Sequence, residues 1–180
     1  GILRPAKTWN PILINFKHSY QLCKDAWRAE SYYDKLRIWF MPTGWRPDDV
    51  AARYPIKHIE DPRHQVKYNT DHSNVFIIWS WFQFGVALLM MLHMFTVVHN
   101  YPGALGYMYV GLIFAHIFSF TTLLDGKKYG VIAEMLKVAI AGYVFYSQDS
   151  SWYSLSGQYI SLIYIYFMCS LIVTFKKIFN

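Results

Sequence analysis

The sequence predicts an all-α integral membrane protein, with a basic amphipathic interfacial head over residues 1–73 and about four transmembrane helices over residues 74–180. Of its 180 residues 54% are hydrophobic and only 16% are charged, whereas soluble domains carry about 25% charged residues. Residues 1–73 hold 20 of the 28 charged side chains, and long uncharged segments follow. This distribution excludes a disordered chain, a disulfide scaffold and a fully soluble enzyme.

An amphipathic helix is expected in the head. Its apolar stripe has spacings of three and four residues and consists of Leu13, Phe16, Tyr20, Cys23 and Trp27. Asp25 and several basic residues lie off this stripe. Such a helix can lie in the membrane interface or pack on a neighbouring domain.

A turn rich in aromatic residues, glycine and proline follows this helix over residues 39–47. Pro47 and the acidic Asp48 and Asp49 favour the start of a short helix, which we expect to end at Tyr54, before Pro55. The tryptophans of the turn have two interpretations: anchors at the level of the lipid headgroups, or contacts to a partner domain.

Four segments are expected to span the membrane: 75–98, 104–124, 130–146 and 157–175. With a rise of about 1.5 Å per residue, the longer ones cross a hydrocarbon core of about 30 Å. The third segment contains Glu134 and Lys137, which lie three residues apart and can pair on one helix face. Charged residues inside a span face protein or water, and the alternative is three spans with an interfacial helix at 130–146.

The positions of lysine and arginine indicate the orientation. The head carries 12 of the 17 basic residues, loop 125–129 carries Lys127 and Lys128, and loops 99–103 and 147–156 carry none. Both termini are therefore expected on the cytoplasmic side, in the endoplasmic reticulum, a bacterial inner membrane or an organelle inner membrane. The net charge of +6 then favours contact with anionic lipid headgroups and not with nucleic acid.

We expect no catalytic, cofactor-binding or metal-binding residue in this chain. No two of the seven histidines lie three or four residues apart, as a metal motif on one helix face requires. His93 and His116 could hold a haem between two spans, but they lie about 8 Å and 18 Å from the outer ends of their helices. We therefore favour histidines that form hydrogen bonds within the bundle.

Parts of the sequence resemble a known family. The run from Tyr33 to Pro55, YDKLRIWFMPTGWRPDDVAARYP, resembles the segment after the catalytic core of sterol desaturase-like proteins, and Gly44-Trp45-Arg46-Pro47 is its most specific part. Arg4 to Pro11 resembles the stretch just after the last histidine box of these proteins. Leu123 to Lys128 and Glu134 to Lys137 look like their C-terminal spans, so the resemblance covers nearly the whole chain. These proteins belong to the fatty acid hydroxylase superfamily, and within it the chain resembles the alkylglycerol monooxygenase type.

The resemblance implies a membrane-bound, non-haem di-iron oxygenase. Its iron is held by histidine boxes on the cytoplasmic side, and the alkylglycerol type cleaves ether lipids with O2 and a reduced pterin. In the family those boxes lie upstream of everything that matches here, and this sequence has no HxxHH box. No iron ligand is therefore carried over, and iron and pterin are expected only in the family's catalytic half.

Three hypotheses follow. The chain is the C-terminal membrane region of a lipid oxygenase that packs on an upstream histidine-box domain, or a noncatalytic accessory subunit of a larger membrane assembly, or an electron-transfer anchor with haem between His93 and His116. The first is favoured, with membrane lipids and the catalytic domain as partners. The residues expected to have structural or interaction roles are Trp39, Phe40, Gly44, Trp45, Arg46, Pro47, Asp125, Glu134 and Lys137.

Overall fold

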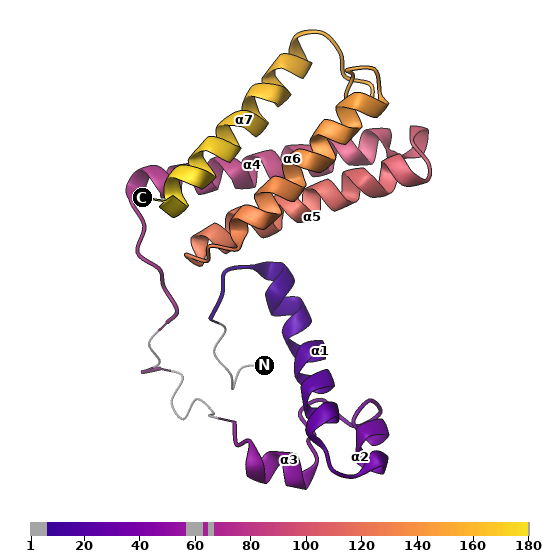
Figure 1. Cartoon of the computed structure of the whole chain (residues 1–180), viewed down its shortest axis with the longest axis vertical. Helices are drawn as coiled ribbons and strands as arrows, with labels where there is room; N and C mark the ends of the chain where they lie inside the picture. The colour runs from indigo at the N-terminus through magenta and orange to yellow at the C-terminus, as the bar shows by residue number, and fades with distance from the viewer. Residues whose placement is uncertain (1–6, 57–62, 65–66, 180) are drawn as a thin grey trace. The chain divides into compact units, whose positions relative to one another are not determined.

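The computed structural model describes residues 7–56, 63, 64 and 67–179. Within them the regular structure is helical, apart from one isolated bridge between Trp152 and Leu155. The chain divides into two compact units, residues 1–69 and 70–180 (Figure 1). The expected boundary lay four residues later, after residue 73.

The head contains three helices: α1 (Pro11–Arg28), α2 (Tyr32–Arg37) and α3 (Asp48–Arg53). The Asn10 side chain starts α1 by accepting hydrogen bonds from the first free N–H groups, and Pro11 occupies the first helical position. The predicted helix between Pro47 and Tyr54 is confirmed as α3, since Pro47 precedes it and Tyr54 ends it. Helix α2 was not expected from the sequence.

The helices of the head are joined by the Arg46 side chain. Its Nε donates to Asp25 Oδ2 at 2.7 Å and its Nη2 to Asp25 Oδ1 at 3.0 Å, while Nη1 donates to the carbonyl of Tyr54 at 2.9 Å. Gly44, with φ of 98°, lets the chain turn back just before Arg46, and the N–H of Trp45 donates to the carbonyl of Pro42. The turn thus directs Arg46 to the centre of the head.

The apolar stripe expected on α1 lies at the surface. Phe16, Tyr20 and Trp27 are 64%, 65% and 87% exposed. The buried face of α1 is instead the one that carries Asp25. The stripe is therefore available to a membrane surface or a partner, which are the two roles that its spacing suggested.

The second unit consists of α4 (Asn74–Val97), which a short 3₁₀ helix (Val98–Asn100) extends, α5 (Ala104–Leu124), α6 (Gly130–Ser147) and α7 (Gln158–Phe179). All four long helices have the length and apolar composition needed to cross a membrane, which confirms the predicted fold class. The helix at 130–147 is among them, and α7 runs four residues beyond the expected end of its span.

Helix α5 lies at the centre of this unit, because it packs extensively on both α4 and α6, and α7 packs on α6 (Figure 1). At one end of the bundle, loop 148–157 folds back into the core. Trp152 and Tyr153 are buried there, and Tyr153 stacks on Tyr109 at 4.4 Å and donates to the carbonyl of Leu105 at 2.7 Å. This loop closes that end of the bundle.

At the opposite end, α5 stops at a glycine. Gly126 has φ of 66°, its N–H donates to the carbonyl of Leu123, and the N–H of Lys127 donates to that of Thr122. This is the Schellman pattern of a helix C-terminus. The carbonyl of Leu124 accepts hydrogen bonds from Thr70 Oγ1 and from His72 Nε2, both at 2.7 Å. The start of α4 is thereby fastened to the end of α5.

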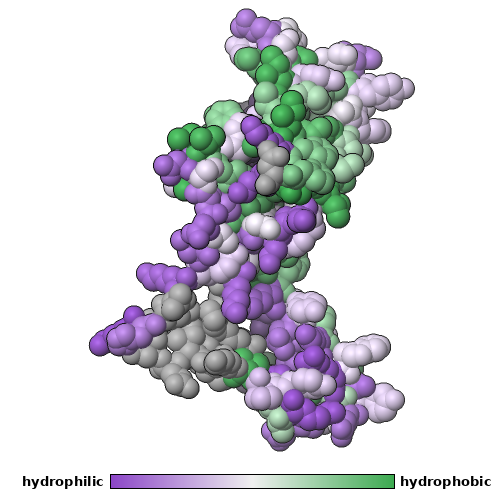
Figure 2. All heavy atoms as spheres, turned by 60° about the vertical axis from the view of Figure 1, so that its left-hand side comes forward, coloured by the Kyte–Doolittle hydropathy of each residue, from purple (hydrophilic) through white to green (hydrophobic). Residues whose placement is uncertain are grey.

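The surfaces of the two units differ in polarity. In the view of Figure 2 the hydrophobic side chains gather on the four-helix unit, whereas the head is mostly hydrophilic or weakly polar. The four helices also expose many large apolar side chains, among them Ile78, Trp81, Leu89 and Phe95. Lipid-facing helices have this character.

Replacement of Arg46 should destabilise the head. The change Arg46→Met leaves Asp25 buried without its counter-charge, so we expect the free energy of local opening to fall by about 3 kcal/mol. Hydrogen exchange of α1 in detergent micelles, followed by mass spectrometry, measures this. Arg37→Met is the control, because Arg37 is exposed and lies over the rings of Tyr33 and Trp45, 5.8 Å and 5.1 Å from their centroids. Equal protection in both variants would contradict the role of Arg46.

The head should also lose stability in acid. Burial raises the pKa of Asp25, but hydrogen bonds from Arg46 and Gln21 outweigh it and hold the pKa below its ordinary value of 3.8. A pKa lowered by folding gives stability that is complete above the ordinary value and is lost as pH falls through the lowered one. We expect exchange protection of α1 to fall below about pH 4. Asp25→Asn should abolish this fall, and Asp49→Asn should largely preserve it.

Candidate functional site: a buried polar network in the four-helix unit

Polar side chains from all four long helices meet inside the second unit. The members are Gln83 on α4, His116 and Ser119 on α5, Glu134 and Lys137 on α6, and Tyr166 and Ser170 on α7. All except Tyr166 are at most 1% exposed. Each lies in a helix that is otherwise apolar, so the network concentrates the polarity of the bundle in its interior.

The network is centred on an ion pair. Lys137 Nζ lies 2.7 Å from Glu134 Oε1, and the two residues are three apart on α6. Ser119 on α5 donates its hydroxyl proton to Glu134 Oε2 at 2.6 Å. Both carboxylate oxygens therefore have partners, one on the same helix and one on the neighbouring helix. A charge inside a membrane helix requires this kind of compensation.

Lys137 extends the network to α7 and α4. Its Nζ donates to Ser170 Oγ at 2.8 Å, and Gln83 Nε2 donates to the same oxygen at 2.9 Å. The ammonium group also lies over the ring of Tyr166, 5.6 Å from its centroid. Lys137 on α6 is thus linked to α7 through Ser170, to α4 through the same serine and Gln83, and to α5 through Glu134 and Ser119.

His116 forms the other end of the network. Its Nε2 lies 2.9 Å from the backbone carbonyl of Gln83, which can only accept, so this nitrogen carries a proton. Its Nδ1 lies 3.2 Å from the hydroxyl oxygen of Tyr166, whose single proton is donated to Gln83 Oε1. Polar contacts therefore connect Ser119, through the ion pair, with His116. His93, outside the network, bonds to Tyr109 at 2.7 Å.

The network can bind protons and fix helix positions, but its members are enclosed by protein. Glu134, Lys137, His116 and Gln83 have almost no exposed surface. These four groups are therefore not accessible from the surface of the bundle. The arrangement is that of a polar lock between helices.

The residues singled out from sequence lie in three places. Glu134 and Lys137 are at the centre of the network, and Asp125 is buried at the C-terminus of α5. The other six lie in the head: Trp39 and Phe40 are exposed, Pro47 is buried, Trp45 and Arg46 are partly buried, and Gly44 is in the turn.

Four members of the network were not expected from the sequence: Gln83, Ser119, Tyr166 and Ser170. A charged pair inside one span requires polar partners, so polar residues near the middle of the other spans are the sequence feature that indicates them. The pairing of Asp25 with Arg46, which lie 21 residues apart, was not expected either. Over residues 7–56, 63, 64 and 67–179, no group of three or more His, Cys, Asp or Glu side chains is placed to hold a metal ion.

Loss of one partner of the ion pair should destabilise the bundle. Glu134→Gln leaves a buried lysine without its counter-charge, so we expect a loss of about 3–5 kcal/mol, read as a lower Tm in detergent. The double change Glu134→Gln/Lys137→Met should recover most of it, because no charge is then left buried. Met135→Ala, on the exposed face of α6, is the control. A double variant less stable than either single one would contradict the expectation.

Comparison with known proteins gives one distant similarity. The chain is 22% identical to human (Homo sapiens) alkylglycerol monooxygenase over 137 residues. The match includes 76% of this chain but 31% of that protein, so the chain spans about a third of its length. No family profile and no solved structure matches the chain. The similarity supports a distant relationship to alkylglycerol monooxygenase, a protein of the fatty acid hydroxylase superfamily.

Proposed function

We propose that the chain is the C-terminal membrane region of a lipid oxygenase of the fatty acid hydroxylase superfamily, and that it packs against and supports an upstream di-iron domain. The observation that carries this proposal is the similarity to alkylglycerol monooxygenase across 76% of the chain. In this proposal iron and the reduced pterin belong to the upstream domain. No residue of this chain is assigned to them.

The geometry of the bundle agrees with the role of a scaffold for that domain. The network of Glu134, Lys137 and His116 is enclosed and joins all four helices. It therefore fixes how the helices are rotated about their axes without offering a group to a substrate. A scaffold of this kind would give a catalytic domain a rigid base in the membrane.

The head supplies the surface proposed to meet the catalytic domain. The apolar stripe of α1, with Phe16 and Trp27, is exposed, and Phe40 after α2 is 88% exposed. Large aromatic side chains are enriched where protein interfaces form. The pair of Asp25 and Arg46 keeps α1 and the turn in one fixed arrangement behind these side chains.

Purification of the native gene product by a C-terminal tag tests the proposal. We expect a polypeptide well above 21.2 kDa that carries histidine boxes and iron and converts an ether lipid with O2 and reduced pterin. A polypeptide of about 21 kDa that copurifies with other membrane proteins, none of them a di-iron protein, would contradict the proposal. That outcome would favour the alternative, a noncatalytic accessory subunit of a larger membrane assembly.

Variants of the exposed aromatic surface test the proposed contact. We expect Trp27→Ser/Phe40→Ser to lower lipid turnover about tenfold or more, because truncation of aromatic anchors at an interface costs about 2 kcal/mol. Both side chains are exposed, so the fold of the head should persist. Trp81→Ser, on the exposed face of α4, is the matched control. Equal turnover in the double variant and the control would contradict the contact.

A further inference from the structure

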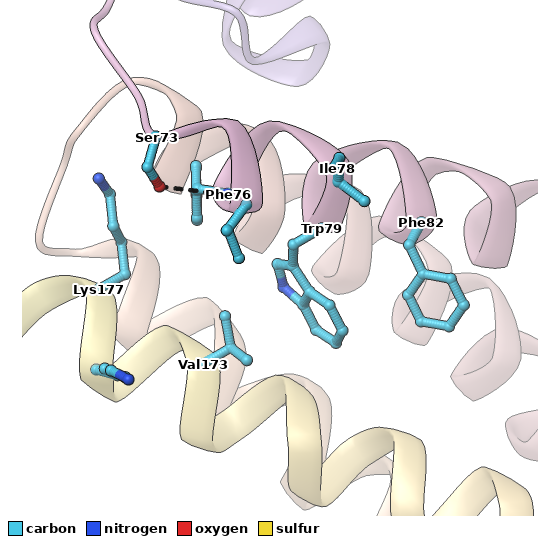
Figure 3. Close-up of a pocket in the computed structure, with 9 residues that line it drawn as sticks. Ser73, Phe76, Ile78, Trp79, Phe82, Val173 and Lys177 are labelled. Carbon is cyan, nitrogen blue, oxygen red and sulfur yellow. Dashed lines mark hydrogen bonds between the residues drawn. The ribbon is translucent and has the colours of Figure 1, made fainter.

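An apolar groove lies between the first half of α4 and the end of α7. It has a volume of about 860 Å³ and its walls include Phe76, Trp79, Phe82 and Val173. This volume is typical of sites that hold a small organic molecule, which range over about 300–1,000 Å³. In Figure 3 the Trp79 ring points from α4 toward α7, into the space beside Val173.

The length of the groove matches one leaflet of a bilayer. Its lining runs along α4 from Ser73, the N-cap, to Phe82. At a rise of about 1.5 Å per residue this is about 14 Å, close to half of a hydrocarbon core of about 30 Å. An acyl chain that enters at the membrane surface would therefore lie along the groove and end near the middle of the bilayer.

The rim of the groove is positively charged. Lys176 and Lys177 are exposed in the last turn of α7, and Lys177 Nζ lies 4.8 Å from the centroid of the Phe76 ring. Neither lysine forms an ion pair with any residue that the structure describes. The N-terminus of α4, with no acidic residue in its first turn, adds its positive dipole end at the same rim.

A hydrogen-bond donor lies unused within the groove. Trp79 Nε1 is buried and has no acceptor among the described residues. A buried N–H without an acceptor is unfavourable, and tryptophan N–H groups usually find one. An acceptor supplied by a ligand below the rim would satisfy it.

We propose that this groove binds one anionic glycerophospholipid. Its phosphate lies between Lys176 and Lys177, an ester carbonyl accepts the proton of Trp79 Nε1, and an acyl chain lies against Phe76 and Val173. The charge of the rim, the leaflet-length wall and the unused donor each match one part of such a lipid. The site does not depend on the proposed oxygenase function, so we expect it both in a lipid oxygenase and in an accessory subunit.

Native mass spectrometry of the full chain, delipidated and titrated with phosphatidylglycerol or phosphatidylcholine, tests the proposal. We expect one phosphatidylglycerol to bind at least tenfold more tightly than phosphatidylcholine. Lys176→Gln/Lys177→Gln should weaken it about 30-fold, since each lysine near an anionic headgroup contributes about 1 kcal/mol. Trp79→Phe, which keeps the ring and removes the donor, should weaken binding of both lipids about fivefold.

Matched variants separate this site from general charge and aromatic effects. Lys127→Gln/Lys128→Gln removes the same charge from the α5–α6 loop, and Trp81→Phe changes an exposed tryptophan of the same helix. Both should bind like the wild type. Equal losses in control and test variants, or equal affinity for the two lipids, would overturn the proposal. Displacement by millimolar glycerol phosphate would likewise overturn it, because the site would then bind a soluble phosphate.

A photoreactive group at the end of the acyl chain of phosphatidylglycerol provides a test without any variant. Crosslinks mapped by mass spectrometry should fall on Phe82 and its neighbours in the wall. Crosslinks distributed evenly over the exposed faces of the four helices would contradict a single groove.

Discussion

The ion pair between Glu134 and Lys137 is the interaction on which the four-helix unit depends. Inside a bilayer, apolar packing alone discriminates weakly between helix arrangements, since lipid tails are as apolar as leucine side chains. A buried charge discriminates strongly, because it must be compensated. Ser119 on α5 donates to Glu134, Lys137 donates to Ser170 on α7, and Gln83 on α4 donates to Ser170 as well. One pair on α6 therefore determines which faces of the other three helices point inward.

The head uses the same principle with a different geometry. Arg46 donates to both carboxylate oxygens of Asp25, and its third nitrogen donates to the carbonyl of Tyr54, the C-cap of α3. The head has a small apolar core around Ile38 and Val50, so this bidentate pair contributes much of its order. Both units thus have a charged pair in the interior and many large apolar side chains at the surface, and the bundle also has a hydrophobic core that includes Tyr109, Leu112 and Tyr153. The exposed apolar side chains are suited to contact with lipid and with the proposed catalytic domain.

Local sequence features were sufficient to predict the structural elements that are determined within one segment of the chain. The spans, the helix between Pro47 and Tyr54 and the pairing of two charges on α6 all follow from composition and spacing within one segment. Contacts between distant residues could not be predicted in this way: Asp25 with Arg46, and Gln83 with Ser170, are separated by 21 and 87 residues. Their partners are determined by helix rotation, which a single sequence does not reveal. The inward fold of loop 148–157 could not be predicted either, because its backbone conformation depends on the burial of Tyr153.

That loop has a consequence for how the protein can evolve. Four of its residues have positive φ values, which residues other than glycine rarely adopt: Asp149, Ser150, Tyr153 and Ser154. The strain persists because Trp152 and Tyr153 are held in the core by stacking and by a hydrogen bond to Leu105. One inserted or deleted residue would move both rings out of place. Divergent descendants can therefore vary the length of other connections, whereas this one is constrained to keep its residue count.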